Sequence, residues 1–280
     1  MDPLDLRIKN FTEIDQDSKL PYTSKKLLEA YKKGAEVIGW KDRKLAGSSK
    51  GHIKHGLGLA SQIWWGGGSP PAYATVKMNR DGSVQVLCGT QDLGTGTYTI
   101  IAQIAAEVLE IPIEKIDVLL GDTQATPYAP SSGGSTTAPS ISPAVYDGAL
   151  QIKAKLMSAA SAILKIDENN LVYSNGEIFE KANKSNSLKT PEIVRKMRER
   201  VLVATGARNQ NPSGYAINTF GVQFADVEVN TLTVKVKVNK IVAAHDIGRT
   251  LNRKTLENQF HGGIMMGLGY ALHEERVMDD

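Results

Sequence analysis

The chain has 280 residues, of which 41% are hydrophobic and 22% charged, a composition typical of a globular protein that buries a substantial core. Its net charge of +3 is small and its lysines are scattered among acidic residues, so no nucleic-acid partner is expected. Its single cysteine, Cys88, excludes an internal disulfide, and the strand-like run before it favours a buried structural thiol over a nucleophile or metal ligand.

The sequence shows no secretory signal at its N-terminus and no membrane-spanning segment. The N-terminus lacks the apolar core of a secretory signal. No window approaches the roughly 18 apolar residues that a membrane helix needs. We therefore expect a cytoplasmic protein with no membrane partner.

Strands and helices alternate along the chain without an obvious repeat or linker. This order predicts an α+β fold with two intertwined α/β lobes, in which mixed sheets are flanked by helices. The predicted elements are, in chain order, a helix over 24–38 capped by Thr23 or Ser24, a strand over 55–65, a hairpin of strands 72–78 and 83–88, a helix capped by Thr97, a strand over 116–120, a helix capped by Ser142 with Pro143 in its first turn, a strand-and-turn segment over 167–189, a basic helix over 191–200, a β-rich segment from Gly214 with a turn over 230–233, and a helix over 253–273.

Two glycine-rich loops, Gly89–Gly96 and Pro130–Thr137, each run into a strongly patterned helix. A helix start has unpaired N–H groups and partial positive charge, so it suits phosphate or another anion. Two such loops favour a large anionic cofactor that is anchored at several points. A tight turn in the first loop and a flexible connection in the second remain open as purely structural alternatives. Neither loop has the lysine of a P-loop or the glycine spacing of a dinucleotide-binding fold.

No group of residues forms a catalytic unit or a metal site by spacing alone. No cysteine or carboxylate cluster accompanies His52 and His55, so no zinc site is expected there. Separate roles are expected for His245 and Asp246, because adjacent residues of a strand face opposite sides. In the last predicted helix, Gln259 precedes a series of glycines. Its amide is either solvated or directed into a buried ligand. We assign no catalytic residue and no metal ligand.

The chain resembles the molybdenum-binding subunit of the xanthine dehydrogenase/aldehyde oxidase family across nearly its whole length. The motifs that carry the resemblance are Gly89–Gly96, the segment 107–120, Pro130–Thr137, the run Asp246-Ile-Gly-Arg-Thr-Leu-Asn, the segment 259–269, and the opening residues 2–11. The order and spacing of these separate motifs agree with the family. The variant of the first loop is most similar to the bacterial aldehyde-oxidising branch.

The resemblance implies a molybdopterin cofactor with molybdenum, in many members the cytosine dinucleotide form, whose dithiolene supplies the metal ligands. It implies hydroxylation of aldehydes or N-heterocycles with oxygen from water, and iron–sulfur and FAD partner subunits that receive the electrons. The residues that it places against the pterin and its phosphates are Gly94, Thr95, Gly96, Gly134, Ser135, Thr136, Thr137 and Gln259. At Thr95 many members of the family have glutamine.

Two parts of the family pattern are missing from this sequence: an upstream half with an active-site arginine, and a downstream glutamate that activates the metal-bound water. A water attacking carbon needs a base within hydrogen-bond reach. We therefore expect residues 1–280 to be the C-terminal part of the cofactor-binding region, truncated at both ends, inactive alone, and partnered with the remainder of the subunit. The alternatives are a structural or interaction module that keeps the fold without cofactor, and an unrelated nucleotide-binding protein.

Overall fold

The computed structural model describes residues 1–44 and 47–278, and the chain divides into two compact units. Unit 1 comprises Met1–Gly66 and Pro212–Asp280, and unit 2 comprises Gly67–Asn211. In sequence, unit 2 is therefore an insertion within unit 1. Helices and sheets of both pairing directions confirm the predicted α+β class.

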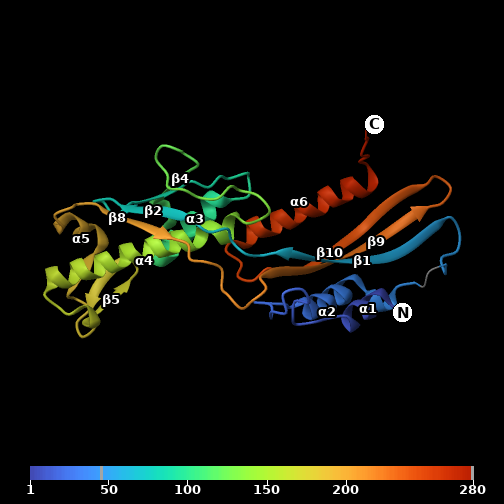
Figure 1. The fold of residues 1–280 in the computed structure, drawn as a ribbon, viewed down its shortest axis with the longest axis horizontal. Helices are drawn as coiled ribbons and strands as arrows, with labels where there is room; N and C mark the ends of the chain where they lie inside the picture. The colour runs from blue at the N-terminus through green and yellow to red at the C-terminus, as the bar shows by residue number, and fades with distance from the viewer. Residues whose placement is uncertain (45–46, 279–280) are drawn as a thin grey trace. The chain divides into compact units, whose positions relative to one another are not determined.

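Unit 2 combines two sheets with three α-helices (Figure 1). Its elements are β2 (Tyr73–Met78), β3 (Val84–Cys88), α3 (Thr97–Leu109), the 3-10 turn η2 (Ile113–Lys115), β4 (Ile116–Leu120), α4 (Thr137–Leu164), η3 (Glu168–Asn170), β5 (Leu171–Ser174), β6 (Glu177–Glu180), β7 (Ser187–Lys189), α5 (Thr190–Lys196) and β8 (Leu202–Ala207). The larger sheet has the strand order β4-β3-β2-β8, and only the β3–β4 pair is parallel. The smaller sheet is the antiparallel meander β5-β6-β7.

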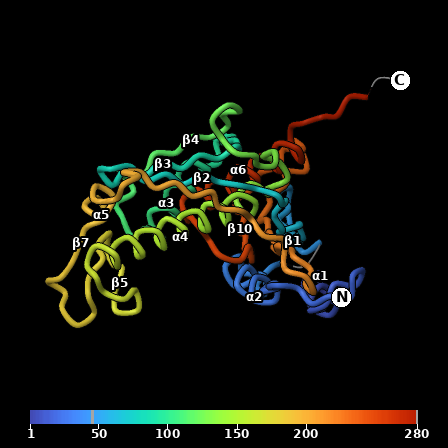
Figure 2. The backbone as a smooth tube through the Cα atoms, turned by 60° about the vertical axis from the view of Figure 1, so that its left-hand side comes forward, coloured from blue at the N-terminus to red at the C-terminus, as the bar shows by residue number. Residues whose placement is uncertain are grey.

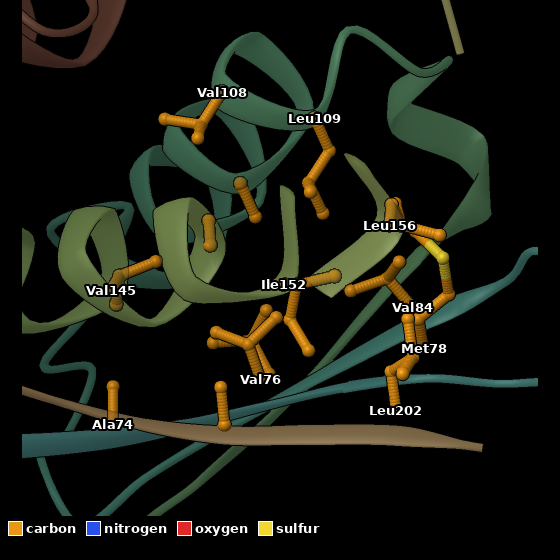
Figure 3. Close-up of a cluster of buried hydrophobic side chains, with 14 of the residues drawn as sticks. Ala74, Val76, Met78, Val84, Val108, Leu109, Val145, Ile152, Leu156 and Leu202 are labelled. Carbon is orange, nitrogen blue, oxygen red and sulfur yellow. The ribbon is translucent and has the colours of Figure 1, made fainter. Parts of the chain in front are cut away.

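The core of unit 2 lies between the larger sheet and α4, which packs against β2 and β8. Alternate strand residues point inward, as the alternating sequence pattern requires, and meet residues spaced by three or four along α4 (Figure 3). Side chains such as Val76, Met78, Ile152 and Leu156 have no exposed surface. Burying each of these stabilises the fold by roughly 1.5–3 kcal/mol relative to exposure. Cys88 belongs to this core, and burial raises the pKa of its thiol to about 12, as expected for a structural cysteine.

Unit 1 is built on a long antiparallel sheet with the strand order β1-β9-β10 (Figure 1), and Figure 2 traces its backbone beside the helices α1 and α2. Its elements are α1 (Pro3–Lys9), α2 (Leu27–Ile38), η1 (Trp40–Asp42), β1 (Ile53–Trp65), β9 (Asn218–Asn230), β10 (Lys235–Asp246) and α6 (Arg253–Leu272). Helix α2 contacts β9 and β10, and the buried residues Phe220, Val222 and Phe224 of β9 form the core with it. The helix lies so close to the strand that a Cβ on Gly34 would be 2.4 Å from the Phe224 ring.

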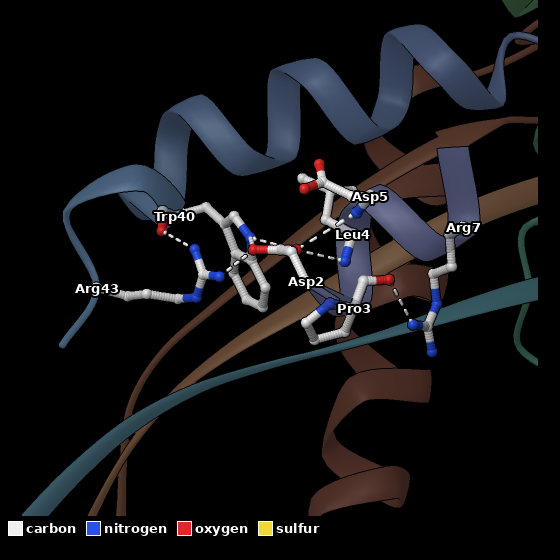
Figure 4. Close-up of polar contacts among 7 residues, drawn as sticks. All are labelled: Asp2, Pro3, Leu4, Asp5, Arg7, Trp40 and Arg43. Atoms are coloured by element: carbon white, nitrogen blue, oxygen red, sulfur yellow. Dashed lines mark hydrogen bonds and ion pairs between the residues drawn. The ribbon is translucent and has the colours of Figure 1, made fainter. Parts of the chain in front are cut away.

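The N-terminal segment is fixed to η1 and to Arg43, which follows it, through one carboxylate (Figure 4). Asp2 accepts the N–H of Leu4 at 2.6 Å, which caps α1, and also accepts the indole N–H of Trp40 at 3.3 Å. Arg43 forms an ion pair with the same carboxylate. Partial burial raises the pKa of Asp2, but these hydrogen bonds and the Arg43 charge outweigh it and hold the pKa below its ordinary value.

Three helix starts differ from the sequence prediction. Helix α2 begins at Leu27, and Ser24 instead donates to Asp246 at 2.5 Å, so neither Thr23 nor Ser24 caps it. Gly96 rather than Thr97 is the N-cap of α3. Helix α4 begins at Thr137 rather than near Ser142, so that Pro143 is inside the helix.

The remaining boundaries mostly agree with the prediction. The hairpin 73–88, the strand 116–120 and the final helix form within two residues of their expected bounds, while α5 ends four residues early, at Lys196. None of the helices in the described ranges combines the length and apolarity needed to cross a bilayer.

Candidate cofactor site

The two glycine-rich loops lie side by side in unit 2, joined through Gln91 and Ser132. The Ser132 N–H donates to Gln91 Oε1 at 2.9 Å, and the Ser132 hydroxyl donates to the Gln91 carbonyl at 2.9 Å. The Gln91 N–H donates to the Ser132 hydroxyl in return, at 3.3 Å. Side chains 41 positions apart in sequence thus form one surface, which sequence periodicity could not predict.

The first loop folds around the carboxylate of Asp92. Asp92 Oδ1 accepts the N–H groups of Gly94 and Thr95, both at 2.9 Å, and of Gly96 at 3.3 Å. Asp92 Oδ2 accepts the N–H of Tyr98, also at 3.3 Å. Partial burial raises the pKa of Asp92, but the four backbone donors outweigh it and hold the pKa below its ordinary value.

This geometry changes the argument that the sequence offered for the first loop. The N–H groups of three residues before α3, and that of Tyr98 in its first turn, already donate to Asp92, whose negative charge lies close to this helix start. These four N–H groups are therefore engaged within the chain. Gly94, Thr95 and Gly96 remain predicted cofactor contacts through their other surfaces.

The second loop has the opposite character. Gly134 and Ser135 both have left-handed backbone, with φ of +59° and +61°, and Thr136 is the N-cap of α4. The side chain of Thr136 forms no capping hydrogen bond with the first turn of this 28-residue helix. The Thr136 hydroxyl instead donates to the Gly133 carbonyl at 2.8 Å. A Cβ on Gly133 would meet nothing within 4 Å, so open space adjoins the loop. The first turn of α4 therefore retains the features that suit an anion.

Arg208 adds a positive charge beside this turn, and sequence reasoning did not identify it. Its Nε donates to the Pro139 carbonyl at 2.9 Å, and its Nη2 donates to Asn211 Oδ1 at 2.6 Å. All bonds that its guanidinium makes within the described chain go to uncharged oxygens. Burial lowers the pKa of Arg208 from its ordinary value, but an arginine stays charged at neutral pH.

The Arg208 contact explains why α4 begins earlier than predicted. In a regular helix the carbonyl of Pro139 would accept the N–H of Pro143, which does not exist. Arg208, which directly follows β8, supplies the missing donor. Taken alone, Ser142 followed by Pro143 indicates a helix start. With the Arg208 bond in place, Pro143 instead lies inside a helix that begins at Thr137.

The other predicted residues belong to unit 1. Gln259 lies on α6 and is exposed. His245 and Asp246 have separate roles, as expected: Asp246 accepts the N–H of Lys26 at 2.8 Å, whereas His245 stacks on Phe260 with ring centroids 4.3 Å apart. Within the described residues, no three His, Cys, Asp or Glu side chains group so as to hold a metal ion.

Comparison with known proteins assigns the chain to a class. Residues 33–280 match the family model of the molybdopterin cofactor-binding domain, and the chain belongs to that family. The resemblance seen in the sequence is thereby confirmed.

Individual relatives give the same result. The chain is 29% identical over 296 residues to the xanthine dehydrogenase molybdenum-binding subunit of Escherichia coli O157:H7, covering 100% of this chain and 39% of that protein. It is 30% identical over 285 residues to the aldehyde oxidoreductase molybdenum-binding subunit PaoC of Escherichia coli strain K12, covering 100% and 37%. Quinoline 2-oxidoreductase from Pseudomonas putida 86 shares the fold, with a TM-score of 0.86 at 22% identity over 100% of this chain and 39% of the other. The chain thus spans about two fifths of the length of these relatives.

Proposed function

We propose that this chain is the molybdopterin-binding region of a molybdenum hydroxylase that oxidises aldehydes or N-heterocycles. When bound, the cofactor would supply a redox-active molybdenum centre through which oxygen from water is transferred to carbon. The proposal includes the cytosine dinucleotide form of the cofactor, and iron–sulfur and FAD subunits as electron acceptors. Its basis is the family membership together with relatives that are named as xanthine dehydrogenase and aldehyde oxidoreductase subunits.

The observation that carries the proposal is the joining of two glycine-rich loops into one surface by Gln91 and Ser132. The residues fit an anionic cofactor, because the start of α4 is open beside Gly133 and has the charge of Arg208 against its first turn. In the proposal, Gly134, Ser135, Thr136 and Thr137 hold the anionic part. Gly94, Thr95 and Gly96 line the pterin, and Gln259 is a further proposed cofactor contact.

The proposal also states that the isolated chain does not turn over substrate. The chain spans 37–39% of the length of its relatives, and no acidic residue in it matches the family's general base. Water attack requires such a base. The remainder of the molybdenum subunit would supply it.

The test is cofactor analysis of the chain purified from a host that makes the molybdenum cofactor. We expect molybdenum and pterin in about equal amounts, and cytidine monophosphate after acid hydrolysis if the dinucleotide form is bound. Aldehyde- or heterocycle-dependent dye reduction should be absent. Protein free of metal and pterin would instead support a structural module without cofactor, and clear turnover would contradict the proposed inactivity.

A matched pair of variants locates the site. Gly134→Val and Gly214→Val both place a branched side chain at positive φ, at +59° and +83° respectively, but Gly214 lies in unit 1 with nothing within 4 Å of an added Cβ. Each should lose a similar stability of about 1–2 kcal/mol through backbone strain. Only Gly134→Val should lose molybdenum and pterin. Equal molybdenum and pterin content in the two variants would contradict the assignment of the second loop to the cofactor site.

A further inference from the structure

We propose that Asp92 is a positioning residue, which holds the backbone of the first cofactor loop in its binding shape before any cofactor arrives. The effect on cofactor binding rests on the proposed function, whereas the role of Asp92 in shaping the loop rests on the hydrogen bonds of the chain itself. Asp92 itself is not placed against the cofactor. It acts through the backbone of Gly94, Thr95 and Gly96.

The pattern of hydrogen bonds distinguishes this role from ordinary helix capping. A capping side chain bonds the N–H groups of the second or third helical residue. Of the four N–H groups that Asp92 accepts, only that of Tyr98 lies within α3, and the other three belong to the loop before it. Most of the bonding capacity of this carboxylate therefore serves the loop.

The loop backbone also shows why it needs such support. Gly94 and Gly96 both have left-handed backbone, with φ of +89° and +90°. A Cβ on Gly94 would meet nothing within 4 Å, so packing does not hold this residue in place. Glycine has the largest conformational freedom to lose on ordering. The Asp92 carboxylate, whose pKa the four donors hold below its ordinary value, opposes that loss through its hydrogen bonds to the loop.

Charge-assisted hydrogen bonds of this kind preorganise a binding surface, so that less ordering is needed when a ligand binds. The Asp92 loop is joined to the second loop by its neighbour Gln91. A change at Asp92 should thus alter the wall that Gly94–Gly96 presents to the cofactor, while leaving the second loop able to retain it.

Three variants of the molybdenum-loaded protein, assembled with its partner polypeptides, test this role. Asp92→Ala removes both acceptor oxygens. Asp92→Asn keeps Oδ1, which accepts three loop N–H groups, and replaces Oδ2, which accepts only Tyr98. The matched control is Asp122→Ala, since Asp122 Oδ1 accepts the N–H groups of Gln124 and Ala125 in another loop of the same unit.

In the cofactor-free chain, amide hydrogen exchange at residues 94–96 should rise at least about tenfold in Asp92→Ala and much less in Asp92→Asn. In the loaded protein, Asp92→Ala should keep most of its molybdenum, but the Mo(V) paramagnetic resonance signal should shift and kcat per molybdenum should fall. Asp92→Asn should recover most of both. Asp122→Ala should change only the exchange near residues 124–125.

Two results would overturn the inference. One is unchanged exchange at residues 94–96 in Asp92→Ala, which can be measured even if the wild-type chain binds no molybdenum. The other is faster exchange with a wild-type Mo(V) signal and wild-type kcat per molybdenum, which would make the role merely structural. Absence of cofactor from the wild type would contradict the proposed function and not the loop geometry, so the two failures are distinguishable.

Discussion

The imidazole of His245 occupies the space where a side chain of Gly221 would lie. A Cβ built on Gly221 would be 2.0 Å from His245 Nδ1, and the two residues are paired across β9 and β10. The ring is also held by Phe260, on which it stacks, and by Gln62, whose Nε2 lies 3.2 Å from Nδ1. Gly221→Ala must displace the ring, so we expect a loss of about 1–3 kcal/mol in the free energy of unfolding.

Gly56→Ala is the matched control, because Gly56 lies on β1 of the same sheet and an added Cβ there would meet nothing within 4 Å. This variant should be neutral or gain roughly 0.5 kcal/mol. Urea unfolding of both proteins gives the comparison. Equal urea midpoints for Gly221→Ala and Gly56→Ala would show that the His245 ring can move without lowering the free energy of unfolding.

Helix α4 approaches β8 through glycine backbones. A Cβ on Gly206 would lie 2.1 Å from the Ala144 carbonyl oxygen and 2.2 Å from the Gly148 nitrogen, and backbone atoms cannot turn aside as a side chain can. Gly206→Ala should therefore destabilise unit 2 by about 3 kcal/mol or more. Thr205→Ala, at the exposed neighbouring position, should remain within about 0.5 kcal/mol of wild type. Similar thermal midpoints for the two variants would contradict this close packing.

The first turn of α4 should depend on Arg208. Arg208→Met keeps the bulk of the side chain but leaves the Pro139 carbonyl without its donor, which should lower the free energy of unfolding by about 1–3 kcal/mol. Hydrogen exchange should accelerate at residues 137–141. The control is Arg195→Met, since Arg195 makes a similar 3.0 Å bond to the Pro191 carbonyl but is exposed. We expect little change there, and an equal loss in both variants would argue against the role of Arg208 in α4.

The ion pair between Glu110 and Lys153 should make stability depend on acidic pH. The hydrogen bond from Lys153 at 2.8 Å, with a further one from the Asn175 N–H, outweighs burial and holds the pKa of Glu110 below its ordinary value. A carboxyl group whose pKa is depressed by folding contributes stability above its unfolded pKa of about 4.3, and loses it as the pH falls through the folded value.

Glu110→Gln should therefore lower the free energy of unfolding by about 1 kcal/mol at pH 7, since the pair is partly exposed, and by progressively less toward pH 3. Urea unfolding across this range measures the effect. Glu114→Gln serves as the control, because Glu114 is exposed. A difference between wild type and Glu110→Gln that is constant with pH would contradict the assignment.

Hydrophobic periodicity was sufficient to predict most of the regular elements. The strand 84–88 forms within one residue of its predicted bounds, because its side chains alternate between buried and half-buried positions. Local patterns were insufficient where a distant residue supplies a hydrogen bond. The start of α4 was misplaced because nothing near Pro143 in sequence reveals that Arg208 replaces its missing N–H.

The candidate site was predictable in the identity of its loops but not in their electrostatics. Glycine and hydroxyl residues before two patterned helices indicated both loops, and family resemblance indicated the ligand. The Asp92 carboxylate inside the first loop places a negative charge at that helix start. An aspartate followed two residues later by glycine is a known local signal for such side chain-to-backbone bonding, and it was available in the sequence. The contact between Gln91 and Ser132 had no comparable signal.

The insertion of unit 2 into unit 1 has a consequence for how the gene product could be rearranged. The two ends of unit 2 are joined by hydrogen bonds, because the Asn211 amide donates to the Gly68 carbonyl at 2.8 Å and accepts the Gly68 N–H at 3.2 Å. For unit 1, residues 67–211 are therefore equivalent to a short connection between two strands. Linking β1 to β9 through a few residues should close unit 1 without its insert, and joining residues 67 and 211 should allow new termini to be opened elsewhere in unit 2.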